Sequence, residues 1–191
     1  MTVFFTSDTH FGHLPITASC RRPYGSAEEM DEALIARWNG IVSARDTVYH
    51  LGDFCHRGSQ NASDYLDRLN GDIPLIVGNH DAQTLQRHAA RFASVSLIGE
   101  IDIGGRALVL CHYPMREWNG CYHGAWHLFG HVHGRLNHVS QGLCLDVGVD
   151  CNAYRPLSFE DVAGIMARRV CPFEKARKRT FKKTIRALSP P

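Results

Sequence analysis

The sequence contains no long hydrophobic run and no stretch typical of a signal peptide. No window approaches the roughly 18 unbroken apolar residues that a membrane-spanning helix needs, so we expect no membrane segment and no membrane partner. Residues 1–5 run directly into polar Thr6, Ser7 and Asp8 without a basic start, which is unlike a secretory leader. Both features indicate a cytoplasmic protein.

Paired cysteine motifs are also missing. The seven cysteines are odd in number and scattered, and no two of them form a Cys-x-x-Cys pair. Reduced thiols in a cytoplasm explain this usage better than a disulfide framework does. The cysteines therefore indicate neither a stapled secreted domain nor a structural zinc site of the Cys/His type.

Lysine is confined to the C-terminal end. All four lysines lie in residues 168–191, which hold nine of the 21 basic residues and one acid, whereas the first 167 residues carry 12 basic and 18 acidic residues. We divide the chain of 191 residues into one domain over 1–170 and a basic tail over 171–191. The tail is either an arm for RNA, DNA or another polyanion, or a solvated terminus that balances an acidic body. We favour the second interpretation.

Apolar patterns alternate between strand and helix in the first half of the chain. Strands are predicted over 3–7, 47–51 and 73–77, and helices over 27–42, over 62–69 and from about residue 81. The second half contains strands over 94–98, 100–103, 106–111, 126–129 and 143–147, mostly as hairpins, and a last helix to about residue 168. Capping boxes begin at Ser26 and Ser158. This order predicts two sheets packed face to face with helices outside.

The stretch Val77-Gly78-Asn79-His80-Asp81 organises the rest of the sequence. An apolar, β-branched segment precedes it, and Gly78 then allows the backbone to turn sharply. Asn79 and His80 are thereby left at the carboxyl end of a buried strand, where open α/β sheets bind their ligands. His50, by contrast, lies inside a strand, and we expect it to be packed and hydrogen-bonded.

Four other predicted strand ends deliver side chains of the same kind. The full set is Asp8, His10, Asp53, Asn79, His80, His112, His131 and His133. Carboxylate, imidazole and amide oxygen together suit borderline divalent ions such as Mn, Fe or Zn. The mixture favours two neighbouring ions that share a carboxylate and an activated water. Such a pair supports in-line displacement at phosphorus, with an attacking hydroxide and metal-held phosphoryl oxygens.

These residues occur in five short motifs whose order resembles that of a known superfamily. The motifs are Asp8-x-His10, Gly52-Asp53, Gly78-Asn79-His80-Asp81, His112 and Gly130-His131-x-His133. Together they resemble the calcineurin-like metallophosphoesterase superfamily. The resemblance is strongest to its small single-domain bacterial-type members, because the stretch around Gly148-Val149-Asp150 is also similar to theirs. The resemblance implies an α/β (α+β) fold, namely a four-layer αββα sandwich of two mixed β-sheets packed face to face with flanking helices.

The resemblance also implies roles by position. Asp8, His10 and His133 would hold one metal ion, Asn79, His112 and His131 would hold the other, and Asp53 would bridge both. His80 would protonate the leaving oxygen or stabilise the transition state. For the cofactor we expect two divalent ions, with Mn as first choice and Fe, Zn, Ni or Mg as alternatives.

Two further residues are candidates for contact with substrate phosphate. Arg57 stands in a Gly-Asp-x-x-x-Arg-Gly stretch similar to that of the family's protein phosphatases, and a guanidinium pairs with phosphate in bidentate fashion. His13 follows the first motif and either touches phosphate or only braces its loop. Asp81 stands where those phosphatases have Glu, and the chain is shorter than theirs, which argues against a phosphoprotein substrate.

The expected activity is metal-dependent hydrolysis of phosphate esters without a covalent enzyme intermediate. The substrate would be a small phosphorylated molecule, and a phosphodiester is our first choice. Three alternatives stay open: a phosphomonoesterase, a nuclease acting on single-stranded nucleic acid with help from the tail, and a binding scaffold with a relic metal site. Loss of single ligands would be the first sign of a relic, and the set here is intact.

Overall fold

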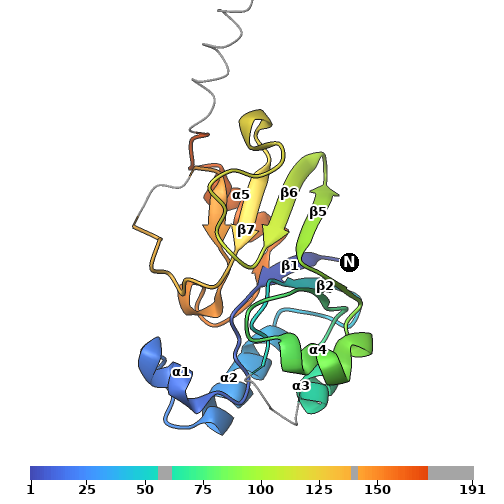
Figure 1. Ribbon diagram of the computed structural model, residues 1–191, viewed down its shortest axis with the longest axis vertical. Coiled ribbons are helices and arrows are strands. Elements are labelled where there is room, and N and C mark those ends of the chain that lie inside the picture. The colour runs from blue at the N-terminus through green and yellow to red at the C-terminus, as the bar shows by residue number, and fades with distance from the viewer. Residues whose placement is uncertain (56–61, 139–141, 172–191) are drawn as a thin grey trace, which may run out of the picture.

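Two mixed β-sheets form the centre of the protein (Figure 1). The computed structural model describes residues 1–55, 62–138 and 142–171. The five-stranded sheet has the order β4-β3-β2-β1-β9, with β1 Val3–Thr6, β2 Thr47–His50, β3 Pro74–Ile76, β4 Ser94–Ser96 and β9 Leu157–Ser158. The four-stranded sheet has the order β5-β6-β7-β8, with β5 Ile98–Ile103, β6 Arg106–Cys111, β7 Trp126–Phe129 and β8 Cys144–Asp146. The predicted fold class, two mixed sheets with flanking helices, is confirmed.

Helices flank the sheets and begin largely where the sequence predicts. They are α1 Leu14–Ser19, α2 Ala27–Asn39, α3 Ala62–Arg68, α4 Ala82–His88 and α5 Phe159–Met166, with single-turn 3₁₀ helices η1 Ala89–Arg91, η2 Cys121–His123 and η3 Val149–Cys151. Ser26 caps α2 by accepting the Glu29 N–H, and Ser158 and Asp161 form a reciprocal capping box at α5. Among the described residues, no helix is long and apolar enough to span a bilayer.

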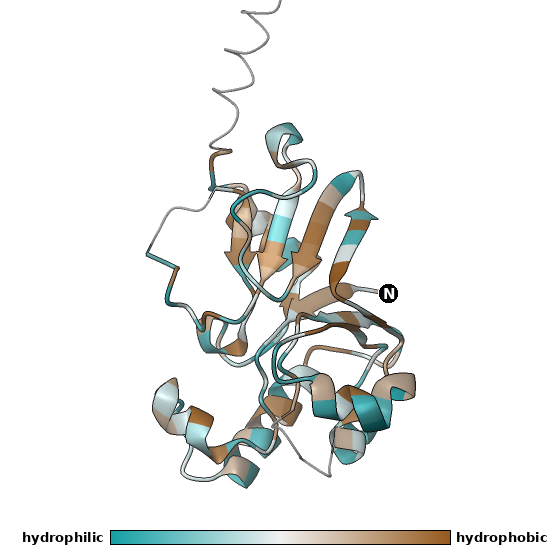
Figure 2. Ribbon diagram, in the orientation of Figure 1, coloured by the Kyte–Doolittle hydropathy of each residue, from teal (hydrophilic) through white to brown (hydrophobic). Residues whose placement is uncertain are grey.

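The core has three apolar layers because strand residues alternate between faces. Figure 2 shows hydrophobic colour concentrated on the strands. Between the sheets, Phe5 and Ile76 pack against Leu108 and Leu128. The outer face of the five-stranded sheet packs on α2, as Phe4, Val48, Met30, Leu34 and Trp38 form one cluster. On the outer face of the other sheet, Val109, Phe129 and Cys144 pack against Trp118 and Cys121.

One local expectation is wrong, and two elements were not expected. The second half contains one hairpin, β5–β6, and then β6, β7 and β8 run parallel. An apolar run does not encode strand direction, so hairpins and parallel crossovers look alike in sequence. Helix α1, Leu14–Ser19, was not expected; Pro15 suits its first turn. The last strand, β9, was not expected at all. The basic tail from residue 172 lies outside the described residues.

His50 is a packed histidine, as expected. It is fully buried, and its Nε2 lies 3.0 Å from Thr9 Oγ1. Burial lowers the pKa of His50 to about 3, with the charge of His112 as a lesser cause. Because an unfolded chain protonates His50 near pH 6.5, this residue favours folding above that pH and its contribution is lost as the pH falls toward 3.

Removing this titration should flatten the acid side of the stability profile. We expect His50→Phe to reduce the slope of unfolding free energy against pH by up to about 1.4 kcal/mol per pH unit between pH 6 and 4. Urea denaturation at several pH values measures the slope for variant and parent. Equal slopes would show that His50 is protonated in the folded state.

Candidate metal centre

Parallel strands bring the predicted residues to one place. The residues follow the carboxyl ends of β1, β2 and β3 in one sheet and of β6 and β7 in the other. A parallel bridge between Ser7 and Gly148 joins the sheets at this edge, since Val149 N–H donates to Ser7 O. Loops from both sheets therefore meet, as the lower centre of Figure 1 shows.

Five of the candidate ligands have left-handed backbone. Their φ angles are Asp8 58°, His10 51°, Asp53 57°, His131 70° and His133 46°. Non-glycine residues adopt this region rarely, and such strain persists only where surrounding structure imposes it. Neighbouring loops supply that constraint: Asp8 N–H donates to Gly52 O and His10 N–H donates to Asp53 O, both at 3.0 Å. This constrained backbone brings the side chains of both loops close together, with His10 Nε2 3.6 Å from Asp53 Oδ2.

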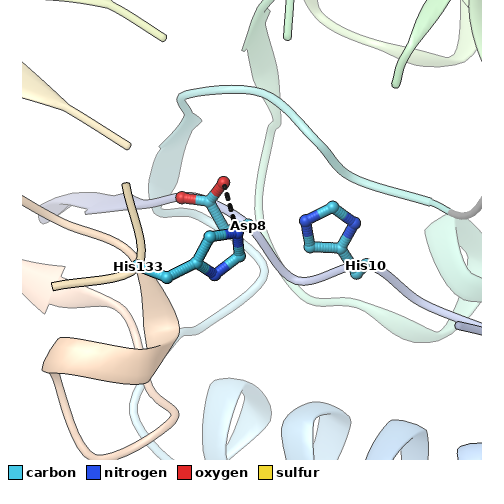
Figure 3. Close-up of side chains that lie close together, drawn as sticks. All are labelled: Asp8, His10 and His133. Carbon is cyan, nitrogen blue, oxygen red and sulfur yellow. Dashed lines mark ion pairs between the residues drawn. The ribbon is translucent and has the colours of Figure 1, made fainter. Parts of the chain in front are cut away.

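Asp8, His10 and His133 form a first ligand group (Figure 3). One ligand atom from each lies within 4.8 Å of the others, and His133 Nε2 is 3.8 Å from Asp8 Oδ1. Asp8 is fully buried, and His10 is 2% exposed with neither ring nitrogen hydrogen-bonded. Buried imidazole nitrogens without a partner are costly unless something else binds them. A divalent cation fits this requirement.

The ionisation of this group is set by burial. Burial raises the pKa of Asp8 to about 6 and strongly lowers the pKa of His10, so the His10 ring is neutral at neutral pH and keeps a lone pair on one of its nitrogens. Burial alone would lower the pKa of His133, but its hydrogen bonds to Asp150 and Cys20 and the charge of Asp8 raise it to about 10. A cation bound here would displace the proton of His133 Nε2.

Asp53, His112 and His131 form a second group, again with ligand atoms within 4.8 Å of one another. His112 Nδ1 lies 2.7 Å from Leu51 O, and because a carbonyl only accepts, Nδ1 is the donor. In the neutral ring His112 Nε2 is then an acceptor, and it faces another acceptor, Asn79 Oδ1, at 3.1 Å. Two converging lone pairs beside a carboxylate form an arrangement that a cation stabilises.

One oxygen of Asp53 faces both groups. Asp53 Oδ2 lies 3.6 Å from His10 Nε2 and 3.5 Å from His112 Nε2. Its Oδ1 accepts the His80 N–H at 2.8 Å, which fixes the carboxylate. A methyl group at Gly78 would overlap this Oδ1, and one at Gly130 would overlap Asp8 Oδ2. Glycine is therefore required at both motif positions, because any side chain there would displace the two carboxylates.

The remaining predicted residues are His80, His13 and Arg57. His80 Nε2 is 3.9 Å from Asp53 Oδ2, and its side chain is 32% exposed. The His13 ring lies beside the first group, with its centroid 5.5 Å from that of His10. The predicted phosphate ligand Arg57 lies outside the described residues. The structure thus gathers seven candidate metal ligands and His80, and it places His13 next to His10.

Asp81 makes contacts that its place at the start of a helix does not reveal. Asp81 precedes α4, but its carboxylate makes no cap hydrogen bond. It instead accepts three buried backbone N–H groups, from Gly78 at 2.7 Å and from Asp53 and Phe54 at 2.9 Å. Asp81 therefore ties the loop after β2 to the loop after β3. The motif Gly-Asn-His-Asp contains this residue, but no local spacing reveals such distant donors.

Replacing this carboxylate should destabilise the protein. Asp81→Ala would leave three buried donors unsatisfied, at about 1–3 kcal/mol for each group before relaxation. We expect a loss of about 3 kcal/mol or more in unfolding free energy, measured by urea denaturation. Asp81→Asn, which keeps one acceptor oxygen, should lose less. If Ala and Asn variants matched the parent, the three hydrogen bonds would be unimportant for stability.

Two other polar residues behind the first group were also missed. Asp150 accepts a hydrogen bond from His133 Nδ1 at 2.7 Å, and Arg22 pairs with the same carboxylate. Asp150 lies in a stretch that contributed to the resemblance, but no role was assigned to it. Arg22 carries no motif signal.

Comparisons with known proteins identify the family and the fold. A family model described as calcineurin-like phosphoesterase matches residues 1–148. The uncharacterized protein MJ1445 of Methanocaldococcus jannaschii is 30% identical over 175 residues, covering 87% of this chain and 92% of that protein. The Gene 66 protein of Mycobacterium phage L5 is 29% identical over 71% of this chain and 84% of its own length. The crystal structure of AQ665, a protein of unknown function from Aquifex aeolicus, shares the fold, with a TM-score of 0.71 at 23% identity over 86% of this chain and 98% of that one.

Proposed function

We propose, from the premise that this chain belongs to the calcineurin-like phosphoesterase family, that it hydrolyses phosphodiesters with two divalent cations held by its two ligand groups. The observation that carries the proposal is the position of Asp53 Oδ2, within 3.6 Å of imidazole nitrogens from both groups. A carboxylate that faces two donor sets can be shared by two cations. Mixed nitrogen and oxygen donors favour Mn over Mg.

Each group has a distinct part in the proposed reaction. Asp8, His10 and His133 hold one cation, and Asn79, His112 and His131 hold the other. When bound, the cations supply Lewis acidity and activate water. The backbone N–H of His80 fixes Asp53, while its partly exposed imidazole donates a proton to the leaving oxygen. The left-handed loops keep these side chains in place before substrate arrives.

A Mn-loaded activity screen tests the proposal. Bis-aryl diesters, aryl monoesters, cyclic nucleotides and short single-stranded oligonucleotides are compared under the same conditions, with chelator-treated protein as control. We expect the diesters to be hydrolysed fastest and chelation to remove the activity. A preference for monoesters, or oligonucleotide cleavage whose affinity falls steeply with salt, would replace the diesterase assignment. Absence of any Mn binding would favour a binding scaffold.

A further inference from the structure

A buried arginine lies directly behind the first ligand group. Arg22 has a fully buried side chain, and its guanidinium donates to four oxygen positions. Nε and Nη2 each donate to Asp150 at 2.8 Å, Nη1 donates to Thr9 O at 2.9 Å, and Nη2 also donates to Asp8 O at 2.7 Å. A buried positive charge next to a proposed cation site is unfavourable in itself. Its contacts indicate what offsets that cost.

The carboxylate of Asp150 connects Arg22 to His133. Asp150 Oδ2 lies 2.7 Å from His133 Nδ1, and because a carboxylate only accepts, Nδ1 is the donor. In the neutral ring this leaves the lone pair on Nε2, the nitrogen that points toward Asp8. Asp150 therefore fixes both the tautomer and the direction of one candidate ligand. Arg22 neutralises Asp150 and holds it in place through two parallel hydrogen bonds.

Arg22 also holds the backbone around the other two ligands of the first group, Asp8 and His10, through Nη1 and Nη2. Asp8 and His10 both have left-handed backbone, with Thr9 between them. The guanidinium binds the carbonyls of Asp8 and Thr9, so it clamps the peptide units on both sides of this strained turn. All three ligands of the first group thus depend on one buried ion pair. In the second group, Asp81 holds the Asp53 backbone and Leu51 O holds His112, and neither contact involves Arg22 or Asp150.

We propose that Arg22 and Asp150 are positioning residues that set the cation affinity of the Asp8–His10–His133 group, and that the second group binds its cation independently of them. The inference rests on the two-cation function proposed above. Removing a partner that orients a metal-binding histidine typically weakens metal affinity by about 10- to 100-fold. The expected effect is therefore confined to one of two sites.

The test compares Mn binding by the full chain and by two conservative variants. Asp150→Asn keeps the shape of the side chain and one acceptor oxygen but loses the negative charge. Arg22→Lys keeps the positive charge but loses the planar guanidinium with its two parallel hydrogen bonds to Asp150. Titration calorimetry gives the number and affinity of bound ions, and electron paramagnetic resonance distinguishes a coupled Mn pair from a single ion. Arg68→Lys is the matched control, because Arg68 pairs with Glu32 through two hydrogen bonds at the exposed surface.

We expect the parent and the Arg68→Lys control to bind two coupled ions. Each test variant should bind one ion with parental affinity and the other about 10- to 100-fold more weakly, with a single-ion spectrum at low Mn. The inference would be overturned if either folded variant bound both ions with parental affinity, or if the affinity for both ions fell equally. A parent that binds fewer than two ions would instead contradict the two-cation function.

Discussion

Asp53→Asn is expected to abolish stoichiometric metal loading and to lower turnover by about a thousandfold or more. Several kcal/mol of transition-state stabilisation depend on the cations, and each 1.4 kcal/mol corresponds to about a factor of ten in rate. Asn tolerates left-handed backbone as Asp does, so the substitution removes the negative charge without adding strain at φ 57°. Metal analysis after gel filtration and kcat/KM on a bis-aryl phosphodiester measure the two effects.

The control for this variant removes a carboxylate elsewhere. Glu160→Gln changes an exposed side chain in the first turn of α5 and should retain both metal and activity. A folded Asp53→Asn protein that still carries two ions at parental affinity would rule out a shared carboxylate. The proposed function would then lose its main support, because it depends on Asp53 being shared by two cations.

His80→Ala is expected to separate metal binding from catalysis. The imidazole lies at the margin of both ligand groups, 3.9 Å from Asp53 Oδ2, and belongs to neither. The variant should therefore bind two ions but react about 10²- to 10⁴-fold more slowly, which is the usual contribution of a positioned general acid. The loss should be larger for alkyl than for aryl leaving groups, because a poor leaving oxygen depends more on protonation.

A series of phosphodiesters with leaving groups of increasing pKa measures this dependence. The rate of the variant should fall more steeply along the series than that of the parent. His123→Ala, at an exposed histidine in η2, is the matched control and should follow the parental line. Full activity of His80→Ala on an alkyl phosphodiester would refute the general-acid role, even if metal binding were unchanged.

Residues at the ends of parallel strands could be predicted to converge because the carboxyl ends of such strands meet at one edge. Asp8, Asp53, Asn79 and His112 follow apolar runs, so each strand end is visible in the sequence. The parallel course of β7 and β8 was not visible, because apolar spacing records burial and carries no information on direction. The β5–β6 hairpin is visible in the sequence, because Gly104-Gly105 between the apolar runs 100–103 and 106–111 suits a tight turn.

The supporting contacts could not be predicted for a different reason. Arg22 and Asp150 are separated by 128 positions, and neither lies in a periodic pattern or a capping motif. Asp81 illustrates the same limit at shorter range: it lies at the start of α4, where a helix was expected, but its carboxylate binds the loop after β2. Contacts between loops depend on tertiary packing, and local sequence preference does not encode them.

The ligand residues with left-handed backbone are expected to lower the stability of the loops that carry the proposed activity. A chain selected for stability alone would carry glycine or asparagine at such positions, since these residues adopt positive φ at little cost. Aspartate and histidine stand there instead. A design effort that optimises melting temperature without an activity screen would therefore tend to replace the ligand residues first. The product would be a more stable protein that no longer binds metal.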